Sequence, residues 1–346
     1  MTVLTYPYEN VPATGAAVAV APGVLWVRLP LPYALDHVNV WLLEDGVDAQ
    51  GRTLWTVVDT GVGLDGIKDV WRRLLPAHPL RRQIVTHCHP DHLGLAAWLE
   101  RETGAPLWIS FGEYAMAQLF SVEAGDFSIA AMVALFARHG LAPERLAALT
   151  ERGNGYVKVV PEIPRTYHRL LGGERLRIGA HTWQTIAGYG HSPEHISLYC
   201  EELRLLISGD MMLPRISTNV SVLAATPDAN PLGLFLDSIA AFRTLPADTL
   251  VLPSHGKPFR GLQTRITELQ QHHRARCSDL LAACDEPKSA AELMPVLFPR
   301  DITDAHQTMF AMGESLAHIN YLAQSGTLVA GSDAGIIKFS KQGAQP

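Results

Sequence analysis

Cysteine is scarce in this chain, with four in 346 residues, and the four are scattered without a close metal-type pair. Positive charge is also short, because 28 lysines and arginines face 34 acidic residues and leave a formal net charge of −6. This balance provides no general attraction to nucleic acid or to an anionic membrane. Together the two shortages favour a reduced, cytoplasmic protein that acts on a small molecule.

Long apolar runs and targeting signals are missing as well. No stretch reaches the roughly 18 residues that a membrane-spanning helix needs, and the N-terminus lacks the basic region and apolar core of a signal peptide. Hydrophobic residues still make up 47% of the chain, which is ample for a core. The length exceeds one ordinary domain of about 100 to 200 residues, so we expect one large and one small domain.

The segment 83–94, with the sequence QIVTHCHPDHLG, gathers three histidines and an aspartate within six residues. Its apolar start, Ile84 and Val85, predicts a buried strand that ends just before His87 and His89. A turn between the two histidines would direct both imidazoles at one ion. The alternative is a histidine-rich surface loop, which explains neither the buried strand nor the helix that follows. The segment therefore predicts a metal site.

Pro90 ends this strand, and Asp91 and His92 follow at the predicted start of a helix that continues over residues 93–100. At a helix N-terminus both side chains point back toward the same site. Other chemistry-bearing residues come directly after predicted strands, where loops carry functional groups. Those that follow further along the chain are His191, Asp210 and His255.

The sequence THCHPDH at residues 86–92 resembles the His-x-His-x-Asp-His signature of the metallo-β-lactamase-fold superfamily. The superfamily's later motifs occur in its order, and the match spans about residues 15–260. The resemblance implies an α+β fold, an αββα metallo-β-lactamase sandwich. It also implies a hydrolase similar to the glyoxalase II and β-lactamase-like-2 branches. The residues of the other motifs are Asp59, His191, Asp210 and His255.

The resemblance further implies a binuclear centre. Three imidazoles would hold one ion, a carboxylate and two imidazoles the second, and one carboxylate would bridge them. Two divalent ions follow, zinc first, with iron and manganese also suited to these ligands. A hydroxide shared by the ions would be the nucleophile, because one Zn²⁺ lowers the pKa of water from 15.7 to about 7. Asp91 would also be catalytic, orienting the water or passing a proton to the leaving group. In the order given, the ligands are His87, His89 and His191; Asp91, His92 and His255; and Asp210.

Five more residues are candidates for support of the ligands or contact with substrate. Asp59 would hold its loop or a ligand imidazole through a hydrogen bond, or else be a plain turn residue. Tyr189 and Glu194 depart from the family's commoner Pro-Gly-His-Ser-Pro-Gly-His pattern. The phenol would donate to a developing oxyanion, and Glu194 would fix His195 or point to solvent. Asn219 lies in a long irregular loop, where substrate contacts are frequent.

Residues 1–262 are expected to form the catalytic domain, with two β-rich halves and outer helices. A helical insertion is expected over residues 111–150, and its aromatic and methionine side chains would either line an apolar pocket or form core. Alternating or continuous apolar runs predict short strands between Pro and Gly punctuation. The predicted strands are residues 18–21, 24–29, 37–43, 54–58, 106–110, 156–160, 175–178, 182–186, 196–200, 203–207 and 249–252.

Residues 263–346 are expected to form a C-terminal winged-helix-like helical module of three helices and a hairpin. This segment has seven lysines and arginines against nine acidic residues, and its predicted helix over 304–323 has no basic residue. Recognition helices normally carry such residues for phosphate contact, so nucleic acid is disfavoured as a partner. The module would instead pack on the catalytic domain or mediate a homodimer. The β-lactamase-like-2 branch has a similar appendage.

Three functions compete for this site. We expect a hydrolase of a small carbonyl substrate: a thioester, an ester or a lactone. A metal-dependent ribonuclease of the same superfamily is the alternative, and the acidic charge balance opposes it. A flavodiiron-type redox protein typically has glutamate where His89 stands. A non-catalytic binding protein would usually have lost ligands, whereas this chain retains the full set.

Overall fold

The computed structural model describes residues 3–33 and 35–343, and the chain divides into two compact units. The first unit comprises the residues up to Ser121, Tyr156–Thr218 and Ser238–Ile266. The second comprises Val122–Gly155, Asn219–Asp237 and the residues from Thr267. The expected insertion is thus divided, because its first helix belongs to the first unit and the rest groups with the C-terminal residues.

The first unit contains a seven-stranded sheet in the order β1 to β7. Neighbouring strands are antiparallel from β1 to β4 and parallel from β4 to β7. Parallel neighbours end at the same edge, so the loops after β4 and β5 lie close together. The strands are β1 Ala17–Ala21, β2 Val24–Pro30, β3 His37–Val47, β4 Thr53–Val58, β5 Leu80–Ile84, β6 Leu107–Ser110 and β7 His168–Leu170.

A second sheet of the same unit has five strands in the order β12-β11-β10-β9-β8. All neighbours are antiparallel except β11 and β12, which run parallel. The loops that follow β11 and β12 therefore leave one edge together. The strands are β8 Arg175–Ile178, β9 His181–Gly188, β10 His195–Cys200, β11 Leu205–Gly209 and β12 Leu250–Pro253.

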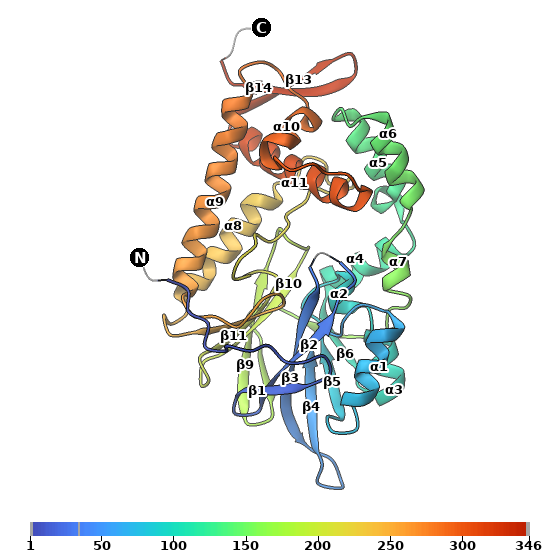
Figure 1. Ribbon diagram of the computed structural model, residues 1–346, viewed down its shortest axis with the longest axis vertical. Coiled ribbons are helices and arrows are strands. Elements are labelled where there is room, and N and C mark those ends of the chain that lie inside the picture. Colours follow the sequence, from blue (N-terminus) through green and yellow to red (C-terminus); the bar gives the residue numbers. More distant parts are fainter. Residues whose placement is uncertain (1–2, 34, 344–346) are drawn as a thin grey trace. The chain divides into compact units, whose positions relative to one another are not determined.

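Successive side chains of a strand point to opposite faces of its sheet, and this alternation builds the core of the two sheets that Figure 1 shows as ribbons. In β2, Trp26 faces the second sheet and packs in one apolar cluster with Trp183 and Leu198. Leu29, on the other face of β2, packs in a second cluster with Trp71. That outer cluster includes helices α1 (Asp65–Leu74) and α3 (Ala96–Thr103). The two sheets thus bury a shared core, and helices cover the outer face of the larger one.

Two predicted elements are wrong. Residues 156–160 form helix α7 (Tyr156–Val159), not a strand, and their burial recurs at helical spacing. The expected helix over residues 93–100 is two helices, α2 (Pro90–Leu93) and α3, separated at Gly94 and Leu95. A β-carbon at Gly94 would lie 2.4 Å from the Pro90 carbonyl oxygen, so this close passage requires glycine. The short strand β7 was not predicted.

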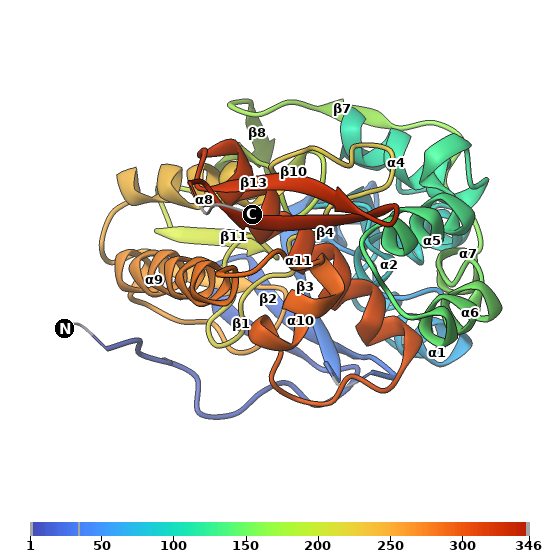
Figure 2. The same cartoon turned by 90° about the horizontal axis from the view of Figure 1, so that it is seen from above.

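The second unit is mainly helical (Figure 2). Helix α11 packs against α6, α10 and strand β13, and strand β14 contacts α5 and α10. Helices α8 and α9 run through both units, and α4 belongs to the first. Among the described residues, no helix has both the length and the apolar character to cross a membrane. The remaining elements are α4 Phe111–Ser121, α5 Ile129–Arg138, α6 Pro143–Arg152, α8 Pro231–Ala241, α9 Leu262–Ala283, α10 Ala290–Leu297, α11 Ala305–Gln324, β13 Leu328–Asp333 and β14 Ile336–Lys341.

Candidate metal centre

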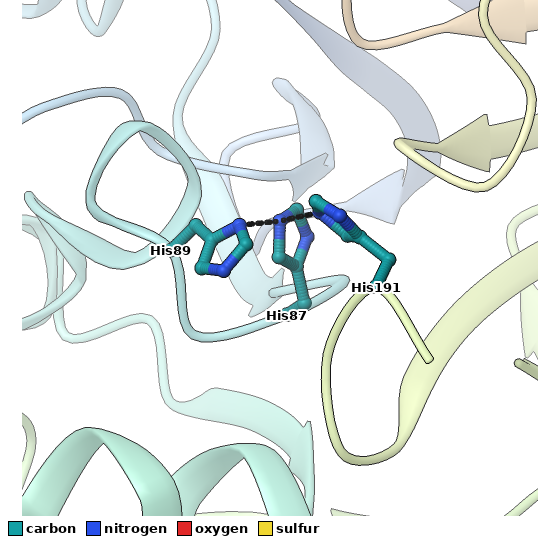
Figure 3. A group of neighbouring side chains, drawn as sticks. All are labelled: His87, His89 and His191. Carbon is teal, nitrogen blue, oxygen red and sulfur yellow. Dashed lines mark hydrogen bonds between the residues drawn. The ribbon is translucent and has the colours of Figure 1, made fainter. Parts of the chain in front are cut away.

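Three imidazoles from two loops meet at one point in the first unit (Figure 3). His87 and His89 lie between β5 and α2, and His191 lies between β9 and β10. The Nε2 atom of His87 is 3.0 Å from Nδ1 of His89 and 3.1 Å from Nε2 of His191. Three ring nitrogens so close together could hold one metal ion, as three of the four ligands of a tetrahedral site.

A second group lies beside the first and shares a carboxylate with it. The Nε2 atoms of His92 and His255 lie 3.5 and 3.4 Å from one oxygen of Asp91. They also lie 3.7 and 3.4 Å from Oδ1 of Asp210. The other oxygen of Asp210, Oδ2, is 3.5 Å from Nε2 of His191. Asp210 therefore directs one oxygen at each group.

The residues present fit two divalent cations. His92 Nε2 and Asp210 Oδ1 are buried and have no hydrogen-bond partner among residues 3–33 and 35–343, although a buried polar atom normally has one. Imidazole nitrogens and carboxylate oxygens are the usual ligands of zinc and also suit iron and manganese. Cations at the two groups would satisfy these atoms. His87, His89 and His191 would hold one cation, and Asp91, His92 and His255 the other.

Asp59 fixes the orientation of two imidazoles, that of His92 directly and that of His87 through Thr86. It follows β4, and its carboxylate accepts hydrogen bonds from the backbone amide of Thr86 at 2.8 Å and from the Thr86 hydroxyl at 3.0 Å. Its Oδ2 also accepts Nδ1 of His92 at 2.8 Å, and Nδ1 of His87 lies 3.0 Å from the Thr86 hydroxyl oxygen. These contacts place a proton on Nδ1 of each ring and direct Nε2 at the ligand groups. The turn-aspartate alternative does not account for these contacts.

His255 is ordered by strand β3. Its Nδ1 donates to the backbone oxygen of His37 at 2.7 Å, and the next amide, that of Gly256, donates to the His37 ring at 2.7 Å. Asn39 is fully buried, and its amide donates to the carbonyl oxygens of Pro253 and Gly256, both at 2.8 Å. The loop after β12 is therefore held at both ends, and Nε2 of His255 faces the two carboxylates.

His195 supports Asp210 and does not join either group. Its Nε2 accepts the backbone amide of Asp210 at 3.2 Å, and its ring is fully buried. A β-carbon at Gly209 would lie 2.2 Å from this nitrogen, and Gly209 has a φ of +54°. Only glycine fits between the ring and Asp210. His195 thus lies beside Asp210 and supports the loop after β11.

Charges around the two groups differ. Burial lowers the pKa of His87 and of His89 well below the usual imidazole value, which favours the neutral form that binds cations. Burial acts the same way on His92, but the carboxylates of Asp91, Asp59 and Asp210 outweigh it and raise its pKa to about 10. The second group therefore lies in a strongly negative field, which attracts a cation.

The other three candidates have hydrogen bonds of their own. The carboxylate of Glu194 accepts a hydrogen bond from the backbone amide of Gly112 at 2.8 Å, so it binds the start of α4 rather than the His195 ring. Tyr189 is 42% exposed, and its amide donates to Ser238 at 2.9 Å. Asn219 belongs to the second unit, where its amide donates to Glu314 at 3.0 Å.

Two supporting residues were not predicted from the sequence. Glu113 is fully buried, and its carboxylate accepts hydrogen bonds from the backbone amides of Cys88 and Glu194. Asn39 holds the loop of His255. Glu113 is the only charged residue in the mostly apolar segment FGEYAMAQLF, and Asn39 is the one polar residue in the apolar run VNVWLL. A polar group in such a place is buried only when it is hydrogen-bonded, and that was the signal available in the sequence.

Comparison with known proteins agrees with this architecture. Residues 33–255 match the family model of the metallo-beta-lactamase superfamily, and residues 277–342 match that of the metallo-beta-lactamase-like C-terminal domain. The structure resembles a beta-lactamase domain protein from Burkholderia ambifaria, with 46% identity, 98% of each chain covered and a TM-score of 0.89. It also resembles a metallo-beta-lactamase family protein from Thermus thermophilus, with 31% identity, coverage of 93% of this chain and 100% of the other, and a TM-score of 0.77.

A relative known from its sequence covers most of the chain as well. The probable metallo-hydrolase YqjP of Bacillus subtilis is 23% identical over 309 residues, which span 86% of this chain and 92% of the relative. The family match covers well over half of the chain and contains both groups of candidate ligands. The expected α+β sandwich with a C-terminal helical domain is confirmed. The chain therefore belongs to the metallo-beta-lactamase superfamily, as a metallo-hydrolase.

Proposed function

We propose that this protein is a binuclear metal-dependent hydrolase of a small carbonyl substrate: a thioester, an ester or a lactone. The observation that carries the proposal is the position of Asp210, whose two oxygens face separate groups of imidazoles at 3.4 to 3.7 Å. A single tetrahedral Zn²⁺ takes only four ligands, so it does not require a carboxylate whose two oxygens face separate groups. Zinc is the first choice of metal, and iron and manganese are the alternatives.

Bound divalent ions supply Lewis acidity and lower the pKa of water from 15.7 to about 7, so that hydroxide is present at neutral pH. The chain's own contribution to proton movement is Asp91. Its side chain is 18% exposed, against 11% for Asp210 and 1% for Asp59. Asp91 is therefore the carboxylate best placed to meet water or substrate. It would hold the attacking water and pass a proton to the leaving group.

The buried supports explain why this site would work without large rearrangement. Asp59 and His37 fix the imidazoles of His92 and His255, and Glu113 binds the loops of His87 and His191. Ligands that are held before substrate arrives need not be reordered during the reaction. Carbonyl substrates are favoured over nucleic acid because the chain carries a net charge of −6.

A substrate panel tests this proposal. We expect the zinc-loaded protein to hydrolyse at least one thioester or lactone with kcat/KM of about 10⁴ M⁻¹s⁻¹ or more, the lower end of the usual enzyme range. Single-stranded RNA should remain intact under the same conditions. The matched control is the same preparation treated with a chelator, which should lose the activity and recover it when metal is restored. RNA cleavage without thioester, ester or lactone hydrolysis would overturn the proposal and favour a ribonuclease.

A further inference from the structure

Three hydrogen bonds join the junction between β6 and α4 to the loop of His191. The Ser110 hydroxyl donates to the Glu194 carbonyl oxygen at 2.7 Å, and the Gly112 amide donates to the Glu194 carboxylate at 2.8 Å. In return, the Glu194 amide donates to the Glu113 carboxylate at 2.7 Å. Each glutamate thus accepts an amide from the other's segment. The same contacts explain why residue 194 departs from the glycine of the commoner motif.

Glu113 joins this loop to the second ligand loop. One oxygen, Oε1, accepts the Ser192 hydroxyl at 2.6 Å as well as the Glu194 amide. The other oxygen, Oε2, accepts the amide of Cys88 at 2.8 Å. Cys88 lies between the two histidines of its loop, and Ser192 directly follows His191. One carboxylate therefore binds the chain next to all three imidazoles shown in Figure 3.

The burial of Glu113 indicates that its carboxylate has a specific role. Its side chain is fully buried, and the removal of a carboxylate from water is unfavourable unless hydrogen bonds offset the lost hydration. An apolar residue at this place in α4 would avoid that cost, but it would leave two backbone amides without partners. Close packing also fixes the junction, since a β-carbon at Gly112 would lie 2.9 Å from the Glu194 β-carbon.

We propose that Glu113 is a positioning residue that sets the distance between the His87–His89 loop and the His191 loop, and with it the affinity of the three-imidazole group for its ion. Glu194 assists by holding the start of α4, so that the Glu113 carboxylate faces both loops. The inference rests on the proposed metal centre but not on any substrate. The other group has different supports, Asp59 and His37, so Glu113 should act on one ion alone.

The test is a competitive zinc titration of the full-length protein against a chromophoric chelator, which resolves the two binding constants. Glu113→Gln keeps the size of the side chain but replaces one acceptor oxygen with an NH₂ group. Both oxygens of Glu113 accept hydrogen bonds, so the NH₂ group must face a donor and at least one hydrogen bond is lost. We expect this variant to bind one of the two ions about 10 to 100 times more weakly, the usual cost of losing a partner that orders ligands. The other ion should keep its wild-type affinity. Glu102→Gln, an exposed site on α3, is the matched control and should change neither constant.

A second variant guards against a general loss of folding. Ser192→Ala removes one of the three donors and leaves both amide contacts, so it should weaken the same ion by a smaller factor than Glu113→Gln. Thermal unfolding of the metal-free proteins separates stability from positioning. Lower stability with both zinc affinities unchanged, or an equal loss of both ions, would overturn the inference. A wild type that binds two ions but hydrolyses no carbonyl substrate would refute the proposed function and leave this inference intact.

Discussion

Asp210→Asn is expected to lower kcat/KM by more than about 100-fold, beyond the usual range for a residue that only orders ligands. The physical reason is that asparagine offers one oxygen and one NH₂ group. The amide nitrogen does not bind a cation, so one of the two groups in the centre loses its shared ligand. The oxygens of Asp210 lie 3.4 to 3.7 Å from three imidazoles, so the remaining oxygen cannot serve both sides at once.

The measurement combines steady-state kinetics with metal content for the wild type and the variant. Asp248→Asn, at an exposed aspartate just before β12, is the matched control and should retain full activity. The variant at Asp210 should bind its second ion more weakly. If it keeps both ions at wild-type affinity and retains more than half of the activity, Asp210 does not bridge them.

Asp91→Asn is expected to give the second large effect, a fall in kcat of about 10² to 10⁴, the usual contribution of a general acid or base. The amide oxygen remains a ligand, so both ions should stay bound. What the amide cannot do is hold and release a proton. The variant should therefore change kcat more than KM. The fall in kcat should be smaller for substrates whose leaving group has a lower pKa, because such a group departs without a proton more easily.

Metal analysis of the same samples decides how Asp91 works. If activity and the second ion are lost together, Asp91 acts as a ligand and has no separate role in proton transfer. If the variant keeps both ions and nearly full activity, the assignment of Asp91 as catalytic is wrong. Comparing thioesters whose leaving groups differ in pKa distinguishes a lost proton donor from a misplaced substrate.

The part of the centre that could be predicted from the sequence is the part encoded locally. His87, His89, Asp91 and His92 lie within one segment between a buried strand and a helix start, and spacing alone brings them together. Asp59, Asp210 and His255 were recognised because each follows a strand and occurs in the order of a known family. Those positions depend on parallel neighbours ending at one edge, which strand order in the sequence makes predictable.

The supports could not be predicted because they depend on distant contacts. Glu113 binds residues 25, 79 and 81 positions away, and no local pattern encodes such pairings. Asn39 binds carbonyl groups more than 200 positions away. The β-branched residues of 156–160 predicted a strand, yet Val159 accepts the Gly63 amide and Tyr156 binds the Cys88 carbonyl from a helix. Tertiary contacts overrode a weak local preference there.

Metal stoichiometry coupled to activity tests the central claim, a binuclear centre, most directly. Metal-free protein is titrated with zinc, bound metal is counted by elemental analysis, and hydrolysis is measured at each step. Because seven candidate ligands form two groups joined by Asp210, we predict about two ions per chain and full activity only when both are bound. Full activity at one ion per chain, with no further rise as a second ion binds, would contradict the account.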